Sequence, residues 1–207
     1  MDFTELKTAL KRYGFDDSDP LDSWLNAGYL DWVCQAYDWP FLQMPPIVIA
    51  TGIGVSNVVL PSDVGHIMTV KNLDNGQKLS AMERTEFERV VNDPTEGGLP
   101  IYYVMTGLDV VTVWRVPNIP VNLRVVYARK LPELVNAGDV PLIPASLHYA
   151  IVQAGAAIAL QSENEEERSE NAEKQFTNTV NRTWSRMSGS QHRDEPPTVT
   201  DVMGYGN

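Results

Sequence analysis

Apolar residues recur at helical spacing near the start of the chain. The stripe that runs from Phe3 to Leu10 predicts a helix over about residues 3–13. Asp2 and Glu5 have the spacing of a capping box, in which the two side chains accept hydrogen bonds from free backbone amides of the first turn. The first element is therefore predicted to be a helix with one apolar face.

A second helical pattern begins after Asp19 and Pro20. Aspartate can cap the free amides of a first turn, and proline suits the first helical position because it has no N–H to leave unpaired. Apolar and small residues then recur three and four positions apart until Pro40 ends the pattern. So wide an apolar face requires partners on more than one side. Its positions are Leu21, Trp24, Leu25, Gly28, Trp32 and Ala36.

Helical periodicity returns after Pro144. Residues 145–161 are rich in alanine and glycine, whose small side chains let neighbouring helices approach closely. Ser162 and Glu165 have the spacing of another capping box and predict the start of a long final helix. The predicted core of a bundle formed by both ends of the chain consists of Leu21, Trp24, Leu25, Trp32, Phe176, Val180 and Trp184.

Between the helical ends, from Ile47 to about Tyr127, short runs of β-branched and aromatic residues alternate with Gly, Pro and Asp. The triplet Asp74-Asn75-Gly76 predicts a tight type I′ hairpin turn. Ser80 and Glu83 have capping-box spacing and predict a short helix that ends near Val91. The middle of the chain is therefore predicted to be mainly β.

The order of these patterns predicts an α+β fold. Four helices from the two ends are expected to form a four-helix bundle, with a β-rich insert at about residues 46–130. As domains, we expect the helical bundle over 1–45 and 140–188, the β-rich insert domain over 46–139, and an extended C-terminal arm over 189–207.

The charge balance restricts the partners of the protein. The chain has 16 Lys and Arg against 27 Asp and Glu, and its net charge is −11. Such a surface does not bind nucleic acid by neutralising phosphates. It is compatible with DNA that passes nearby without specific binding, because an acidic wall adheres weakly to DNA.

The chain lacks the marks of membrane insertion and secretion. No apolar run approaches the roughly 20 residues of a membrane-spanning helix, and the N-terminus does not resemble a signal peptide. We therefore expect synthesis in the cytoplasm and no membrane partner. The single cysteine, Cys34, cannot form an intramolecular disulfide and is expected to be a small buried thiol.

The residues that usually carry catalysis or bind metal ions do not converge in the sequence. His66, His148 and His192 are far apart, and no pair has the spacing of helical metal ligands. The acidic run Glu163–Glu170 lacks the ligand pattern and turn glycine of a calcium loop, so a solvated helix face is expected. Thr51-Gly52-Ile53-Gly54 lacks the Lys-Ser/Thr of a phosphate loop. No catalytic residue, cofactor site or metal site is predicted, although a site composed of distant residues stays open.

An aromatic cluster precedes the β-rich region. Residues 24–41 include Trp24, Trp32, Trp39 and Phe41, which could stack on the bases of single-stranded nucleic acid. Stacking platforms are usually interleaved with basic residues, and residues 14–70 contain no Lys or Arg. Core packing is therefore the preferred interpretation.

This stretch also resembles part of a known family. The segment from Trp32 to Leu42 is similar to the aromatic "Tyr-x-Trp-Pro-Phe-Leu" that ends the second helix of bacteriophage head–tail adaptor proteins. The resemblance continues, over roughly residues 20–185, in Leu60-Pro61-Ser62-Asp63, Leu79-Ser80 through Phe87, Pro100-Ile101-Tyr102-Tyr103, Trp114-Arg115-Val116-Pro117-Asn118, Val125-Val126-Tyr127-Ala128-Arg129-Lys130 and Ile143-Pro144 with Leu147-His148. Arg115 departs from the family pattern, which has proline there.

The resemblance implies a non-catalytic structural protein of a tailed phage. Such an adaptor forms a ring, usually dodecameric, under the portal in the virion neck. Its partners would be the portal protein, copies of itself and a downstream tail or neck protein, with DNA passing through the channel. Two alternatives stay open, namely another phage assembly protein such as a tail-tube or stopper component, and an unrelated host enzyme or binding module.

The final residues suggest an arm that docks on a partner. A polar stretch from Ser188 leads to Pro196-Pro197, which favour an extended path. The apolar residues that follow are more numerous than a solvated tail requires. We expect this arm to dock into the portal or an adjacent subunit through Val199, Val202, Met203 and Tyr205.

Overall fold

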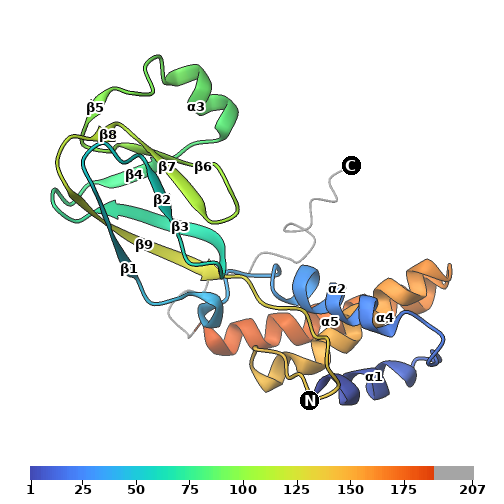
Figure 1. The fold of residues 1–207 in the computed structure, drawn as a ribbon. Coiled ribbons are helices and arrows are strands. Elements are labelled where there is room, and N and C mark those ends of the chain that lie inside the picture. The colour runs from blue at the N-terminus through green and yellow to red at the C-terminus, as the bar shows by residue number, and fades with distance from the viewer. Residues whose placement is uncertain (189–207) are drawn as a thin grey trace. The chain divides into compact units, whose positions relative to one another are not determined.

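The structure, a computed structural model, describes residues 1–188 and separates into two compact units. Residues 1–41 and 131–188 form the first, here called the helical unit, and residues 42–130 form the second, the β unit (Figure 1). The helical elements outside the β unit are α1 (Phe3–Lys11), α2 (Leu21–Ala27), the π-helix η1 (Gly28–Val33), the 3-10 turn η3 (Ala145–Leu147), α4 (His148–Ser162) and α5 (Glu166–Met187), and a second 3-10 turn, η2 (Pro40–Leu42), leads into the β unit.

Helix α4 is the centre of the helical unit. It packs against α1, α2, η1 and α5, and Figure 1 labels the three α-helices of this group beside it. Most of its residues are buried, and they lie on all faces of the helix. The small alanines and Gly155 leave room for partner segments around it. Its position explains why this segment of the sequence shows no polar face.

Two glycines allow a close backbone contact between helices. A Cβ atom at Gly28 would lie 2.8 Å from the carbonyl oxygen of Ile151 and 2.9 Å from the amide nitrogen of Gly155. A Cβ atom at Gly155 would lie 3.2 Å from the carbonyl oxygen of Trp24. The backbone of α2 and η1 therefore lies directly on the backbone of α4.

The expected four-helix bundle with a β-rich insert is wrong. The described residues form an α+β molecule with five α-helices and a large, strongly curved seven-stranded sheet, and one of these helices, α3 (Arg84–Val90), belongs to the β unit. A bundle requires helices that each keep one wet face, whereas α4 is enclosed. The second helix is also shorter than predicted. Its regular α geometry ends at Ala27, and the chain continues as the π-helix η1.

Of the side-chain caps predicted at helix starts, only the first is present in the structure. The capping box of Asp2 and Glu5 is present in α1. Asp19 does not cap α2, because its carboxylate accepts a hydrogen bond from the Asp16 amide in the preceding turn. The other two predicted capping boxes are absent, since α3 and α5 begin after Glu83 and Glu165 without a side-chain cap, and Ser80 lies in a strand.

The β unit contains two sheets. Its strands are β1 (Ile47–Thr51), β2 (Asn57–Val59), β3 (Val64–Asn72), β4 (Lys78–Ala81), β5 (Gly97–Gly98), β6 (Tyr102–Met105), β7 (Val110–Trp114), β8 (Val116–Pro117) and β9 (Val121–Arg129). The large sheet has the order β1-β9-β3-β4-β6-β7-β2, and β5 pairs with β8 in the small one. β4 joins the two halves of the large sheet, because Lys78 and Leu79 pair with β3 whereas Ser80 and Ala81 pair with β6.

The predicted hairpin turn is present between β3 and β4, but it is not of type I′. Gly76 has a φ of +72°, whereas a type I′ turn requires positive φ at both central residues. The amide of Asn72 donates to the carbonyl oxygen of Gln77 and closes a wider turn.

The large sheet must curl. Its edge strands, β1 and β2, are consecutive in the chain and are joined only by residues 52–56. A flat sheet of seven strands would place its edges about 29 Å apart, whereas the six Cα–Cα steps from Thr51 to Asn57 span at most about 22 Å. Curling encloses a core to which β9 contributes every second residue. The buried residues of this core are Val58, Leu60, Val64, Val70, Leu79, Tyr103, Val111, Val113, Val121, Leu123, Val125 and Tyr127.

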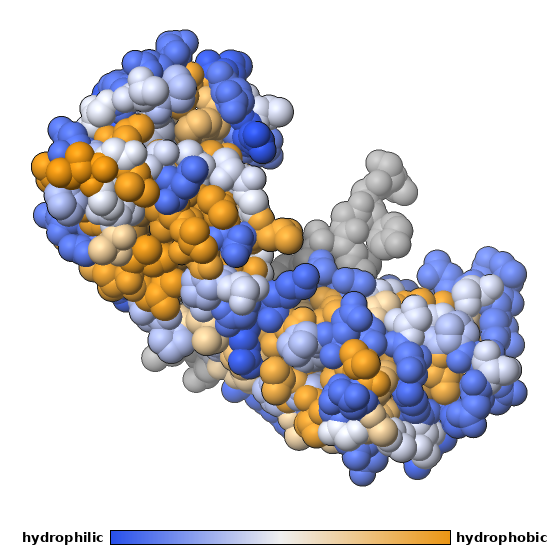
Figure 2. Space-filling view, viewed as in Figure 1, coloured by the Kyte–Doolittle hydropathy of each residue, from blue (hydrophilic) through white to orange (hydrophobic). Residues whose placement is uncertain are grey.

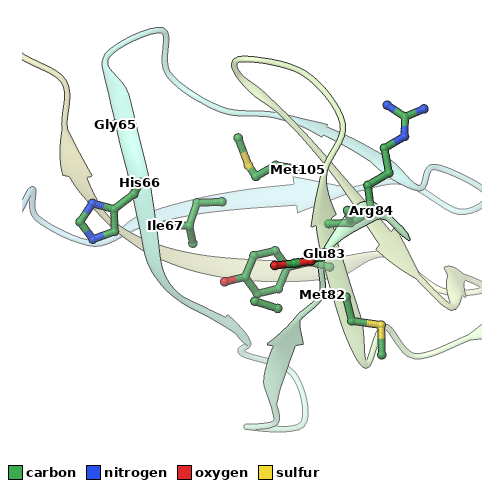
Figure 3. Close-up of a pocket in the computed structure, with 10 residues that line it drawn as sticks. Gly65, His66, Ile67, Met82, Glu83, Arg84 and Met105 are labelled. Carbon is green, nitrogen blue, oxygen red and sulfur yellow. The ribbon is translucent and has the colours of Figure 1, made fainter. Parts of the chain in front are cut away.

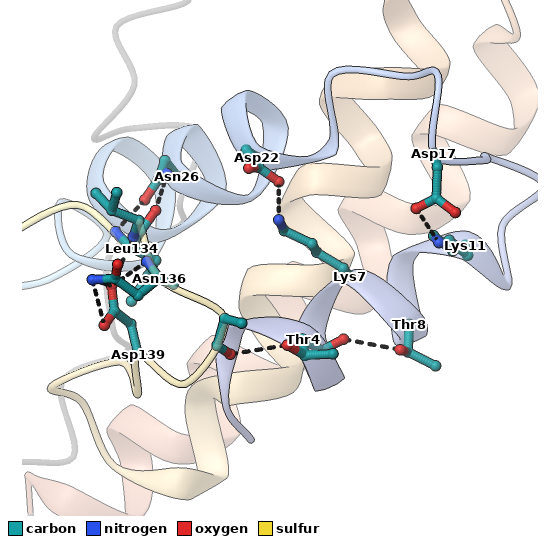
Figure 4. A network of polar contacts seen from close by, with 12 residues as sticks. Thr4, Lys7, Thr8, Lys11, Asp17, Asp22, Asn26, Leu134, Asn136 and Asp139 are labelled. Atoms are coloured by element: carbon teal, nitrogen blue, oxygen red, sulfur yellow. Dashed lines mark hydrogen bonds and ion pairs between the residues drawn. The ribbon is translucent and has the colours of Figure 1, made fainter.

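A polar network anchors the returning chain to the helical unit (Figure 4). The Asn26 side chain donates to the carbonyl oxygen of Leu134 at 3.0 Å and accepts from the Leu134 amide at 2.8 Å. The Asp139 carboxylate accepts from the amides of Val135 and Asn136, and these bonds hold its pKa below the ordinary value. The segment that follows the β unit is therefore tied to α2 by direct hydrogen bonds.

Candidate interaction surface

The residues predicted for the bundle core occupy two different environments. Leu21, Leu25, Phe176 and Val180 are buried in the helical unit. The three tryptophans of the predicted core, Trp24, Trp32 and Trp184, are only half-buried, and each contacts another aromatic ring. The ring pairs are Trp24 with Phe15, Trp32 with Phe176, and Trp184 with Tyr37, at centroid distances of 5.0, 5.3 and 4.5 Å.

The aromatic segment around residues 37–41 has a structural role. Trp39 is fully buried, and its indole N–H donates to the carbonyl oxygen of Val33 at 2.6 Å. The Tyr37 hydroxyl donates to the side-chain oxygen of Asn181 at 2.6 Å, and its ring stacks on Trp184. These rings therefore join the end of the second helical segment to α5 and are not available to stack on bases.

Cys34 is not an activated nucleophile. Burial, with a smaller contribution from the negative charge of Asp31, raises the pKa of its thiol to about 12. Because the thiolate is the reactive form of cysteine, the group stays protonated and inert near neutral pH.

His148 is held by hydrogen bonds within the helical unit. Its Nε2 lies 3.0 Å from the carbonyl oxygen of Ile143, and its Nδ1 lies 2.8 Å from the amino group of Met1. A carbonyl oxygen only accepts, so Nε2 carries the proton and Nδ1 accepts from the amine. Burial is the main cause that lowers the pKa of this imidazole, and the neighbouring amine lowers it further. Among residues 1–188 no group of three or more His, Cys, Asp or Glu is arranged to hold a metal ion.

A cavity of about 380 Å³ lies in the β unit, between β3 and the segment from β4 to β6 (Figure 3). Its wall includes Ile67, Met82 and Met105. His66 and Arg84 lie on opposite sides of the view and point away from one another (Figure 3). The lining is mixed, because polar side chains of His66, Glu83, Arg84 and Tyr103 stand beside the apolar ones.

The most exposed apolar side chain of the β unit is Leu108, which is 93% exposed in the turn between β6 and β7. A longer run of exposed apolar side chains follows β1, β2 and their connecting loop. The exposed fractions are 58% for Val48, 66% for Ile53, 44% for Val55 and 65% for Val59. Figure 2 shows hydrophobic residues gathered on the part of the β unit where Figure 1 draws β1 and β2. We call residues 47–59 the β1–β2 segment. Exposed apolar surface of this kind is typical of sites that bind other proteins.

The charges of the protein are divided unequally between the units. Residues 42–130 contain eight Lys or Arg and eight Asp or Glu, so the β unit has no net charge. Residues 1–41 and 131–188 contain seven basic and sixteen acidic residues, so the helical unit carries −9. From Trp39 to Ser62 the chain has no charged side chain at all. The apolar β1–β2 segment thus lies within an uncharged stretch of the neutral unit.

The sequence alone did not predict an interaction site in the β1–β2 segment. The charge-free run was visible, but its position at both edges of one sheet depends on pairing between residues far apart in the chain. The predicted docking residues Val199, Val202, Met203 and Tyr205 lie outside the described residues. No helix within residues 1–188 is long and apolar enough to cross a membrane.

Comparison with models of protein families matched residues 1–200 of the chain to the SU10 adaptor protein. Comparison with curated proteins gave no match.

Proposed function

Because the chain belongs to the SU10 adaptor protein family, we propose that it forms a ring, dodecameric in the usual case, under the portal of a tailed phage and connects the head to a downstream tail or neck protein. The family assignment itself indicates a structural phage protein of the virion neck and not an enzyme. The observation that carries the proposal is the extent of the match, residues 1–200, which includes both units of the fold.

The division of charge supports a channel-lining role for the helical unit. With a net charge of −9, this unit repels the phosphates of DNA. DNA that leaves the head must slide past the neck without adhering to it. We therefore assign the wall of the proposed DNA channel to the helical unit.

The same charge supports assembly on a template. Like-charged helical units repel one another at long range, so copies gain little by associating in dilute solution. A portal that binds each copy raises their local concentration and offsets the repulsion. The ring is accordingly proposed to close on the portal.

The direct test is electron microscopy of purified portal with and without this protein. The expected result is an added ring of density beneath the portal, whose rotational symmetry gives the number of copies. Portal particles that stay unchanged at saturating concentrations of the protein would contradict the proposal.

The C-terminal arm is proposed to contribute to this attachment. Val199, Val202, Met203 and Tyr205 offer apolar side chains after Pro196-Pro197. Burial of larger apolar side chains contributes roughly 1.5–3 kcal/mol each before the cost of ordering the arm.

Deletion of residues 196–207 should lower portal occupancy while it leaves the melting temperature unchanged. Wild-type occupancy by the truncated protein would exclude the arm from docking. Deletion of residues 189–195 alone is the matched control for a change in the length of the arm.

A further inference from the structure

The β1–β2 segment combines two free sheet edges. β1 forms its ladder with β9 and β2 forms its ladder with β7, and among the described strands neither pairs on its other side. Their outer backbone groups therefore stay available for hydrogen bonds. Proteins usually protect such edges with charged side chains or proline.

In this protein prolines shorten the exposed edges, but no charged side chains protect them. Pro46 precedes β1 and Pro61 follows β2, so each edge offers only a few backbone groups. No charged side chain stands on either strand or on the loop between them. The outward residues Val48 and Val59 are instead apolar and more than half exposed. A short, apolar and uncharged edge suits a limited and specific protein contact.

The charge distribution identifies another copy of the chain as the partner. Nucleic acid or a highly charged protein surface gains no electrostatic attraction from a segment without charged side chains. Two copies repel each other through their helical units, each with −9, whereas their neutral β units approach without that cost. The β1–β2 segment is therefore an apolar surface of the neutral unit at which copies can meet without that repulsion.

A contact of this kind is compatible with ring geometry. A ring forms through heterologous contacts, in which two different surfaces of one subunit meet their counterparts on the two neighbours. β1 and β2 are two distinct edges with different sequences and opposite directions. We propose that the β1–β2 segment contacts the neighbouring copy in the assembled ring, an inference that rests on the proposed function.

Photo-crosslinking identifies the partner directly. Val59 is replaced by benzoylphenylalanine in the full-length protein, which is then assembled on portal and irradiated. The expected product is an adduct of two copies, with twice the 23.1 kDa mass of the chain. Val90 serves as the control position, because it lies in α3 of the same unit among charged neighbours and should give no such adduct. A product that links the chain to portal instead would overturn the inference.

Charge insertion tests the energetic role of the surface. Val59→Lys should reduce complete rings on the portal about tenfold or more, since tenfold corresponds to only about 1.4 kcal/mol. Val48→Lys is a second variant on the other edge, and its side chain is also more than half exposed, so both proteins should keep the wild-type melting temperature. Val90→Lys is the matched control and should assemble as the wild type does.

The outcomes separate this inference from the proposed function. If the wild type forms rings on portal and both lysine variants form them equally well, the β1–β2 segment is not the contact, while the adaptor ring stands. If Val90→Lys loses assembly as strongly as Val59→Lys, the effect is not specific to the segment and the inference fails. If the wild type forms no ring at all, the proposed function fails first.

Discussion

Gly28 shows how one missing side chain determines a packing arrangement. The residue begins η1 and faces the backbone of α4 at Ile151 and Gly155. A side chain of any size would have to displace main-chain atoms, which belong to a helix packed on several sides. The close approach of the two segments thus depends on glycine at this position.

Gly28→Ala should destabilise the protein by about 1–3 kcal/mol, because a methyl group would overpack the contact with α4. Chemical unfolding followed by circular dichroism measures the change. Gly138→Ala is the control, since a Cβ atom there meets nothing within 4 Å and should change stability by less than about 0.5 kcal/mol. Equal stabilities of the two variants would contradict the described packing.

His148 makes stability depend on pH. Its pKa in the folded protein lies below the ordinary value of about 6.5, so the unfolded chain binds the proton more tightly. The free energy of unfolding is therefore expected to fall as the pH drops below about 6.5 towards the folded pKa. The neutral form alone can accept from the Met1 amine while it donates to Ile143.

The test compares the unfolding free energy of the wild type with that of His148→Gln between pH 5 and pH 8. The variant should show a flatter profile in this window. His66→Gln, at an exposed position of β3, is the control and should keep the wild-type slope. Parallel profiles for His148→Gln and the wild type would exclude this role of His148.

Among the elements, those with strong local signals were predictable and those fixed by distant partners were not. The capping box of α1 and the β-branched runs of β1, β3, β7 and β9 gave elements close to the expected positions. Residues 78–81 were expected near a helix start, but they form β4 because they complete the ladder between β3 and β6. Pairing across the sheet outweighed the local capping signal there.

The π-helix η1 could not be predicted from the sequence either. Its residues, 28–33, continue the apolar pattern of α2 without a break. The change of helix type coincides with the close contact of Gly28 with α4, and that contact involves residues more than a hundred positions away. The candidate interaction surface was missed for the same reason, since the strand order that leaves β1 and β2 at the edges is a long-range property.

Helix α5 is attached to the rest of the helical unit through Phe176. The side chain is fully buried and packs its ring edge-on against Trp32 of η1. Phe176→Ala should lower the unfolding free energy by about 3–5 kcal/mol. Lys174→Ala, an exposed position on the same helix, should cost less than about 0.5 kcal/mol because both side chains of its ion pair with Glu170 are mostly exposed to solvent. Thermal unfolding measures the melting temperatures of the two variants. Similar values would contradict the described packing of Phe176.

For the whole molecule, the separation of charge determines how copies respond to salt. At 0.1 M salt, charges act over about 10 Å, and at 1 M over about 3 Å. Screening reduces the repulsion between helical units of −9 and leaves the apolar contact of the β units in place. Association without portal should therefore increase with salt.

Light scattering of the purified protein across this range of salt measures the effect. A rise in mean mass with salt is expected for the wild type, and a weaker rise for Val59→Lys. A tight dodecamer at low salt that does not depend on concentration would contradict the repulsion on which template assembly rests.

The chain enters and leaves the β unit at one place. Gln43 forms a β-bridge with Ala128, and the Met44 amide donates to the carbonyl oxygen of Tyr127. The two ends of residues 42–130 are thus hydrogen-bonded to each other, while the core of that unit is made from its own residues. An in-frame exchange of this one stretch of codons would replace the entire unit and leave the surrounding protein continuous. Recombination between related genes could therefore vary the surface offered by the β unit while it keeps the acidic helices unchanged.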